Sequence, residues 1–409
     1  MRNIVFLLAL MILPCYTAFA SDNIQDAFSD GTLKGELRVF DFSREFTDST
    51  TTRHDTAAGM LMYYNSDSLY GLSAGGAFAT SNDIGSSDQD DVYGLLAKDK
   101  KGDHESFTRL QEYWVQGDYF KTKVKIGAQQ IHSPWASERD VRLVPNTFKG
   151  LTVVNKSIPN LVASFYYITE FNAVDSTSFM SISKSINSNI TEDKDLQVVS
   201  LDYDIPASFA KMKVQGWYYN VPDIFNTGWY GFDISKKYES FEPYLESQAI
   251  IQRSQGDELA GDISTEQYAA TTGIRFRKGF DVSIAYAKTT DGDLLDPWGG
   301  KKGILQTVKG ADRAHEDTYV AAVKYDFSKI GVNGLTALVS YGIYDIPGMQ
   351  GPWGDMRETD CDVQYRFSGK LEGFKLRTRY SIVNIQNAAD WKDVRIMASY
   401  TFTLKGKKK

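Results

Sequence analysis

Stretches of about ten residues in which apolar and polar side chains alternate recur from about residue 33 to residue 403. There are eighteen of them, and the gaps between them are by turns short and long. Alternation gives a strand one apolar and one polar face, and about ten residues let a tilted strand cross a bilayer. Strands of soluble sandwiches average about five or six residues. The pattern therefore predicts an all-β fold, an 18-stranded antiparallel transmembrane β-barrel with short periplasmic turns and long extracellular loops.

The alternation also predicts which side chains face lipid. In the last stretch Ile396, Tyr400 and Phe402 share one face, and Arg395 lies on the other. A charged side chain on the lipid face costs roughly 2–4 kcal/mol at mid-depth. We therefore expect the apolar face outside and the charged face lining a water-filled lumen.

The chain begins with the features of an export signal. Arg2 precedes a short apolar run, and Ala18, Phe19 and Ala20 form a small-x-small cleavage site. No change of composition divides the rest, so we expect one barrel domain with short flanking segments. The expected division is a cleaved signal peptide at 1–20, a periplasmic segment at 21–32, a barrel at 33–403 and a basic tail at 404–409.

Charge and cysteine content exclude some classes of function. The formal net charge of −7 argues against nucleic-acid binding. Cleavage of the signal would leave Cys361 as the single cysteine, so no intrachain disulfide is expected.

Residues suited to catalysis or metal binding do not form a recognisable constellation. His132 and Ser133 are adjacent in an expected loop, but no third residue is placed to orient the histidine. No glycine-rich phosphate loop opens a helix. We therefore expect no enzymatic activity, no cofactor and no metal site. The histidines all fall in expected loops without metal-ligand spacing: His54, His104, His132 and His315.

Closure of the barrel would gather cationic side chains on one wall. If the last strand pairs with the first, the final three strands and the first one are contiguous. Arginine presents a flat fork to carboxylates, and a cationic wall in a narrow lumen concentrates anions. The alternative is that these side chains only balance charge around ordinary porin water. The expected basic wall consists of Arg38, Arg366, Lys375, Arg377, Arg379 and Arg395.

Residues 121–150 carry a more specific signal. They begin KTKVKIGAQQ and end VRLVPNTFKG, an R-x-x-P-x-T-F-x-G run from Arg142 to Gly150. This segment resembles the OprD-type family of substrate-selective outer-membrane porins, and residues 27–38 resemble that family's first strand.

The resemblance implies a monomeric eighteen-stranded channel, in which an arginine ladder guides solutes that carry a carboxylate. It also implies that the loop at 131–148 folds inward as the constriction. The alternative for this loop is a solvated surface segment that Pro145 merely ends. The residues expected near the narrowest point are Glu138, Arg139, Asp140 and Arg142.

The favoured function is a porin of the bacterial outer membrane, a passive channel for small hydrophilic solutes that prefers anionic or carboxylate-bearing ones. The expected partners are outer-membrane lipid, lipopolysaccharide and these solutes, with a monomer favoured over a trimer. One alternative is a general porin without selectivity. The other is a structural or adhesive barrel with a blocked lumen.

Overall fold

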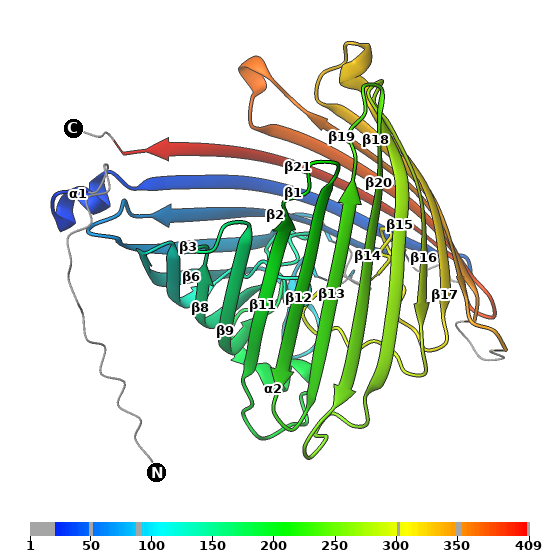
Figure 1. The fold of residues 1–409 in the computed structure, drawn as a ribbon, viewed down its shortest axis with the longest axis horizontal. Coiled ribbons are helices and arrows are strands. Elements are labelled where there is room, and N and C mark those ends of the chain that lie inside the picture. Colours follow the sequence, from blue (N-terminus) through cyan, green and yellow to red (C-terminus); the bar gives the residue numbers. More distant parts are fainter. Residues whose placement is uncertain are drawn as a thin grey trace.

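A computed structural model describes residues 21–48, 52–86, 92, 94–300, 303–348 and 354–406. The expected signal peptide and residues 407–409 lie outside this part of the chain. Eighteen long antiparallel strands and the two-residue strand β10 form one sheet (Figure 1).

The long strands are β1 (Thr32–Phe46), β2 (Thr52–Asn65), β3 (Leu72–Asp83), β6 (Phe107–Tyr119), β7 (Thr122–Gln129), β8 (Thr147–Asn155), β9 (Leu161–Asn172), β11 (Leu196–Ile205), β12 (Lys211–Val221), β13 (Phe225–Ser235), β14 (Phe241–Ser254), β15 (Ser264–Phe276), β16 (Phe280–Thr289), β17 (Asp317–Asp326), β18 (Leu335–Asp345), β19 (Met356–Arg366), β20 (Phe374–Ile385) and β21 (Trp391–Lys405). The short elements are α1 (Ile24–Ser29), β4 (Ala97–Lys98), β5 (His104–Glu105), β10 (Met180–Ser181), α2 (Ile182–Ile186), η1 (Phe327–Ile330) and η2 (Gly369–Leu371).

The barrel closes where β1 meets β21. The two strands pair from Thr32 opposite Lys405 to Phe46 opposite Trp391, so neither is left as an open edge (Figure 1). Gly35 lies directly opposite Phe402, and a Cβ there would stand 2.1 Å from Cζ of the ring. The glycine thus lets Phe402 cover the seam. The predicted closed eighteen-stranded barrel is confirmed.

Strand boundaries differ from the sequence prediction at a few places. The third strand begins at Leu72 instead of residue 68, because residues 66–71 form a turn in which Gly71 has a φ of +82°. The last strand continues two residues past the predicted end, so Lys405 is part of the barrel wall and pairs with Thr32. The prediction also missed α1, β10 and α2.

The exposure of side chains confirms the predicted faces. Ile396 on β21 and Tyr319 on β17 are exposed on the outer surface, whereas Asp393 and Arg395 are buried inside. Neither α-helix in the described part of the chain is long and apolar enough to cross a bilayer.

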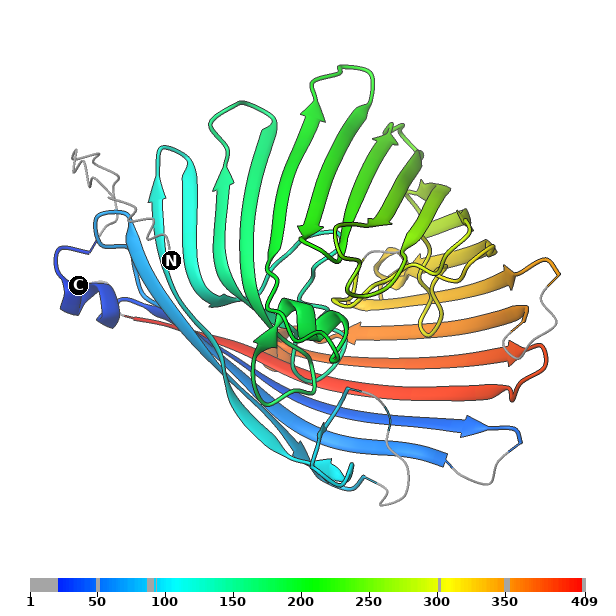
Figure 2. The same ribbon diagram turned by 90° about the horizontal axis from the view of Figure 1, so that it is seen from below.

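The lumen is less uniformly wet than the alternation suggested. Figure 2 shows α2 and several loops inside the ring of strands. Trp135 and Trp298 from two of these loops are buried in one apolar cluster with Ile182 of α2 and with inward-facing Tyr219 and Phe225. Inward-facing aromatic side chains on β12 and β13 give the loops an apolar surface to pack on. The prediction of a wholly water-filled lumen is therefore wrong for this side of the barrel.

Two neighbouring alanines on β17 test the assignment of faces. Ala321 faces outward near the middle of the strand and Ala322 faces inward. We expect Ala321→Lys to lower the free energy of unfolding by about 2–4 kcal/mol and Ala322→Lys to have a much smaller effect. Reversible unfolding in lipid vesicles measures both, and equal losses would contradict the assignment.

Candidate functional site

The loop at residues 130–146, between β7 and β8, crosses the lumen. At one end the backbone N–H of Trp135 donates to the hydroxyl of Tyr219 on β12, at 3.1 Å. Further along, Asp140 contacts Arg38 on β1. In the closed strand order β1 and β12 are nearly opposite, so the loop touches two facing walls. The alternative of a solvated surface loop is therefore wrong.

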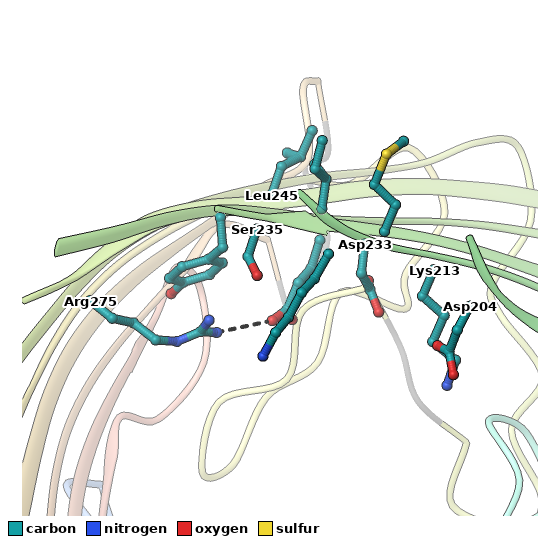
Figure 3. A pocket seen from close by; sticks show the side chains of 11 residues that line it. Asp204, Lys213, Asp233, Ser235, Leu245 and Arg275 are labelled. Carbon is teal, nitrogen blue, oxygen red and sulfur yellow. Dashed lines mark hydrogen bonds and ion pairs between the residues drawn. The ribbon is translucent and has the colours of Figure 1, made fainter. Parts of the chain in front are cut away.

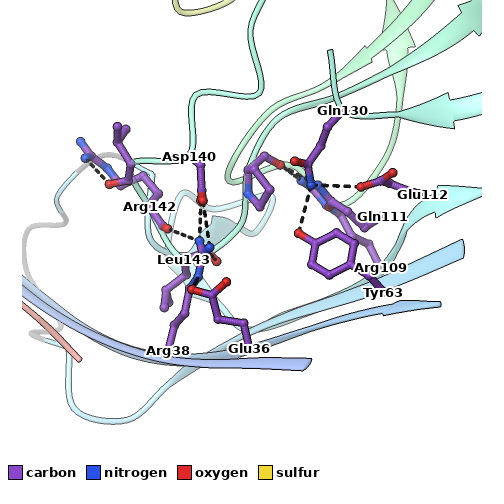
Figure 4. A network of polar contacts seen from close by, with 12 residues as sticks. Glu36, Arg38, Tyr63, Arg109, Gln111, Glu112, Gln130, Asp140, Arg142 and Leu143 are labelled. Carbon is purple, nitrogen blue, oxygen red and sulfur yellow. Dashed lines mark hydrogen bonds and ion pairs between the residues drawn. The ribbon is translucent and has the colours of Figure 1, made fainter. Parts of the chain in front are cut away.

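Arg38 holds this loop through its guanidinium (Figure 4). Its two terminal nitrogens reach the two carboxylate oxygens of Asp140 at 2.5 and 2.9 Å. One of them also donates to the carbonyl oxygens of Arg142 and Leu143, and Nε donates to Glu36 at 2.9 Å. The alternation of residues on the first strand predicts Arg38 on the solute-facing wall. Its donors are instead occupied in fixing the loop.

A second buried arginine, Arg109 on β6, joins two loops and was missed from the sequence. Its Nη2 donates to the carbonyl oxygen of Pro145 in loop 130–146, at 2.9 Å. Its Nη1 donates to Asn172 Oδ1 and to the carbonyl oxygens of Ala173 and Ser176, which begin the loop at residues 173–195. Within the described residues no carboxylate lies at ion-pair distance from it. Arg109 is 5% exposed, so its role is to position these loops.

A β-bulge explains why alternation concealed Arg109. Tyr113 and Val115 on β6 face outward, which places Arg109 on the outer face by simple parity. The pairing of β6 with β3 shifts between Ala77 and Phe78, so one extra residue is inserted near Gln111. A bulge of this kind moves every residue beyond it to the other face. A charged residue at an apparently lipid-facing position is the signal that could have revealed it.

Among the described residues, the two arginines of β20 share one acidic partner. Arg377 Nε and Arg379 Nε both donate to Asp362 on β19, at 2.9 and 3.0 Å. Lys375 and Arg366 lie nearer the periplasmic end, and neither has an ion-pair partner among the residues that the structure describes. This part of the wall therefore keeps a net positive charge toward the lumen.

Arg395 lies in a different environment from the other wall residues. It donates to Asp393 at 2.7 Å and to the carbonyl oxygen of Thr307, in the loop at residues 290–316. Arg44 pairs with the same Asp393 at 2.6 Å. Because Arg395 is 5% exposed and bonds to Thr307, it anchors this loop and is largely covered from the lumen.

The opposite wall carries mainly acids. In the closed order β11 lies nine strands from β20, so the two are diametrically opposed. Figure 3 shows Asp204, Lys213, Asp233 and Arg275 on one face of the sheet, with Leu245 on the other. The inward-facing acids of this region outnumber its three cations, Lys211, Lys213 and Arg275. They are Asp202, Asp204, Asp233, Glu242, Glu246 and Asp281.

The other residues predicted for the constriction lie at different places. Glu138 accepts a hydrogen bond from His132 at 2.7 Å, within the loop itself. Arg139 and Arg142 act electrostatically on Asp175 of loop 173–195, as does Arg109. Burial raises the pKa of the Asp175 carboxyl, and the three arginines oppose this shift.

Two further findings bear on the chemistry of the site. The Ser133 hydroxyl donates to the carbonyl oxygen of Ala136 at 2.6 Å, so its hydrogen stabilises the loop turn. Among the described residues no cluster of three or more His, Cys, Asp or Glu could hold a metal ion.

Comparison with known proteins gives consistent matches. Residues 25–404 match the family model described as outer membrane porin, OprD family. The fold is similar to OccK9 (OpdG) of Pseudomonas aeruginosa, with a TM-score of 0.82 and 20% identity over 92% of this chain and 100% of that one. It is similar to OccAB3 of Acinetobacter baumannii, with a TM-score of 0.82 and 19% identity over 92% of this chain and 100% of that one. It is also similar to P. aeruginosa OpdK, solved with vanillate, with a TM-score of 0.81 and 19% identity over 92% of this chain and 100% of that one. No curated protein sequence matches significantly.

The role of Arg109 in positioning the two loops can be tested by chemical rescue with guanidinium ion. Arg109→Ala leaves carbonyl groups of two loops without their charged donor, which should cost about 2–4 kcal/mol in the stability of the loop arrangement. In planar bilayers we expect larger open-channel noise, and guanidinium ion in the bath should restore the native trace. Arg275→Ala, which removes an arginine that contacts neither loop, should show no such rescue. Unchanged noise in Arg109→Ala would contradict the positioning role.

The raised pKa of Asp175 predicts a pH effect. As the pH falls below neutral, this carboxylate is protonated at a higher pH than an exposed one and loses its negative charge beside the arginines. Reversal potentials should therefore shift toward anion selectivity as the pH falls. Asp175→Asn should show the higher anion selectivity already at pH 7 and a weaker pH response, whereas exposed Asp262→Asn should behave as the native channel. A full response in Asp175→Asn would rule out this residue as the source.

Proposed function

This chain belongs to the OprD family of outer membrane porins, and we propose that it is a passive diffusion channel favouring small solutes that carry a carboxylate. The observation that supports this most directly is the sharing of Asp362 by Arg377 and Arg379. Two guanidinium groups on one carboxylate leave a net positive charge. Neither terminal nitrogen of Arg379 is needed for its bond to Asp362, which runs through Nε. These N–H groups are suited to bind a solute carboxylate.

The loop at residues 130–146 sets the narrowest part of the proposed path. Arg38 and Arg109 hold it from two strands, so the opening has a fixed shape. A carboxylate solute would pass between this loop and the wall that carries Lys375, Arg377 and Arg379. The acids on β11–β14 lie across the lumen, and the two walls together produce a transverse field.

The alternatives fit these contacts less well. A general porin does not need an excess of arginine on one wall and an excess of acid on the wall that faces it. A blocked adhesive barrel does not need Lys375 and Arg366 to face the lumen without an ion-pair partner among the described residues. We infer that the barrel catalyses no reaction, in keeping with a family of channels. The matched OpdK structure contains vanillate, a carboxylate, and the preference proposed here is of that chemical class.

Reversal potentials in a salt gradient test the proposal. The native channel should prefer anions. A unit charge about 4 Å away is worth about 1 kcal/mol even in water, so Arg377→Ala with Arg379→Ala should lower the anion-to-cation permeability ratio about fivefold or more. Lys213→Ala, on the opposite wall, should lower it less. Cation selectivity of the native channel would refute the proposal.

Liposome swelling separates the three functions. Small organic acids should enter faster than neutral sugars of equal size through the native channel, and the difference should shrink in the double variant. Equal rates would favour a general porin, and no swelling with any solute would favour a blocked barrel.

A further inference from the structure

The short connections at the end of the barrel where β1 begins and β21 ends carry exposed apolar side chains. We call these eight connections the periplasmic rim; they are residues 66–71, 120–121, 156–160, 206–210, 236–240, 277–279, 327–334 and 367–373. Phe120 is 80% exposed and Tyr70 is 74% exposed. The most exposed large apolar residues of the rim are Tyr70, Phe120, Ile158, Phe209, Ile330 and Leu371.

A cation accompanies nearly every one of these side chains within two positions in the sequence. Two connections hold no cation of their own: 66–71 has an acid, Asp67, and 206–210 is uncharged but is followed by Lys211 at the start of β12. The cations beside an apolar rim residue, all of them exposed, are Lys121, Lys156, Lys211, Lys237, Lys329 and Lys370.

The charges of the two ends of the barrel have opposite sign. The eight connections of the periplasmic rim hold eight Lys and Arg and three acids, a net +5. The connections at the opposite end, between the same eighteen long strands, hold eleven Lys and Arg and twenty-four acids, a net −13. The formal net charge of the whole chain is −7, so the positive charge of the rim does not follow from the overall composition.

The turn between β6 and β7 has residues that its backbone does not favour. Phe120 and Lys121 are its two central residues, with φ values of +51° and +58°. A two-residue hairpin with both φ positive strongly prefers Asn-Gly, because bulky side chains are strained there. The backbone of this turn therefore does not account for an aromatic followed by a lysine.

We propose that the periplasmic rim binds anionic phospholipid of the inner leaflet of the outer membrane. Apolar side chains next to lysines are the pattern of segments that lie in an anionic membrane interface. Each apolar tip would enter the boundary between headgroups and acyl chains, and its neighbouring lysine would contact a phosphate. An anionic cell-wall polymer would attract the lysines alone and would offer no apolar surface to Phe120, Ile158 or Leu371.

Lipid selectivity measures this directly. The native chain would be reconstituted in phosphatidylcholine vesicles, and association of spin-labelled phosphatidylglycerol would be compared with that of spin-labelled phosphatidylcholine. We expect about a threefold or greater preference for the anionic lipid, reduced by added salt. A variant with Lys121→Gln, Lys156→Gln, Lys329→Gln and Lys370→Gln should lose at least half of it.

A matched control removes lysines at the other end of the barrel. Lys100→Gln with Lys101→Gln, both exposed in the long connection between β3 and β6, should leave the preference unchanged. Equal lipid preference in the native chain and the four-lysine variant would overturn the proposal. Retention of native protein on purified cell-wall sacculi, lost in that variant while lipid preference is unchanged, would overturn it in favour of the polymer.

The depth of Phe120 provides a second readout that does not depend on the lysines. On a Cys361→Ser background, a nitroxide would be attached at Phe120→Cys, with Gly102→Cys at the opposite end as the water-exposed reference. The label at position 120 should be more accessible to oxygen than to a water-soluble nickel relaxant, in the reverse order of position 102. Equal accessibility to the nickel relaxant at both positions would overturn the proposal.

Discussion

Satisfaction of backbone hydrogen bonds is the constraint on which this structure depends. The hydrocarbon core offers no water to an unpaired N–H or C=O, so a sheet can cross it only when its first and last strands pair. Here β1 and β21 pair over their whole length. That closure brings the first and last strands together, and with them the arginines of β20 and β21 and the charged residues of β1.

Closure alone does not decide what these charges do. Arginines that look equivalent in the sequence have separate roles because of what lies next to them. Arg38 meets Asp140 of an inward-folded loop, and Arg395 meets Thr307 of another, so both hold loops in place. Among the described residues, Arg377 and Arg379 form ion pairs with Asp362 alone. In the proposed function, selectivity rests on the arginines that the loops leave uncovered.

The sequence predicted the strand count, the faces of the strands and the segment that folds into the lumen. Alternation could do this because lipid on one side and water on the other impose opposite requirements on neighbouring residues. It failed for Arg109, where one inserted residue reverses the face of everything beyond it. It also failed to predict the buried apolar cluster around Trp135, because that cluster joins loops distant in the sequence.

By itself, then, the amino-acid sequence determined the barrel and which side of each regular strand meets water, since both follow from local periodicity. Only the tertiary structure decided which charges remain available to a solute. Ion pairs such as Arg38 with Asp140 join residues about a hundred positions apart. Their partners are set by how the loops pack across a closed lumen, and no local pattern records that distance.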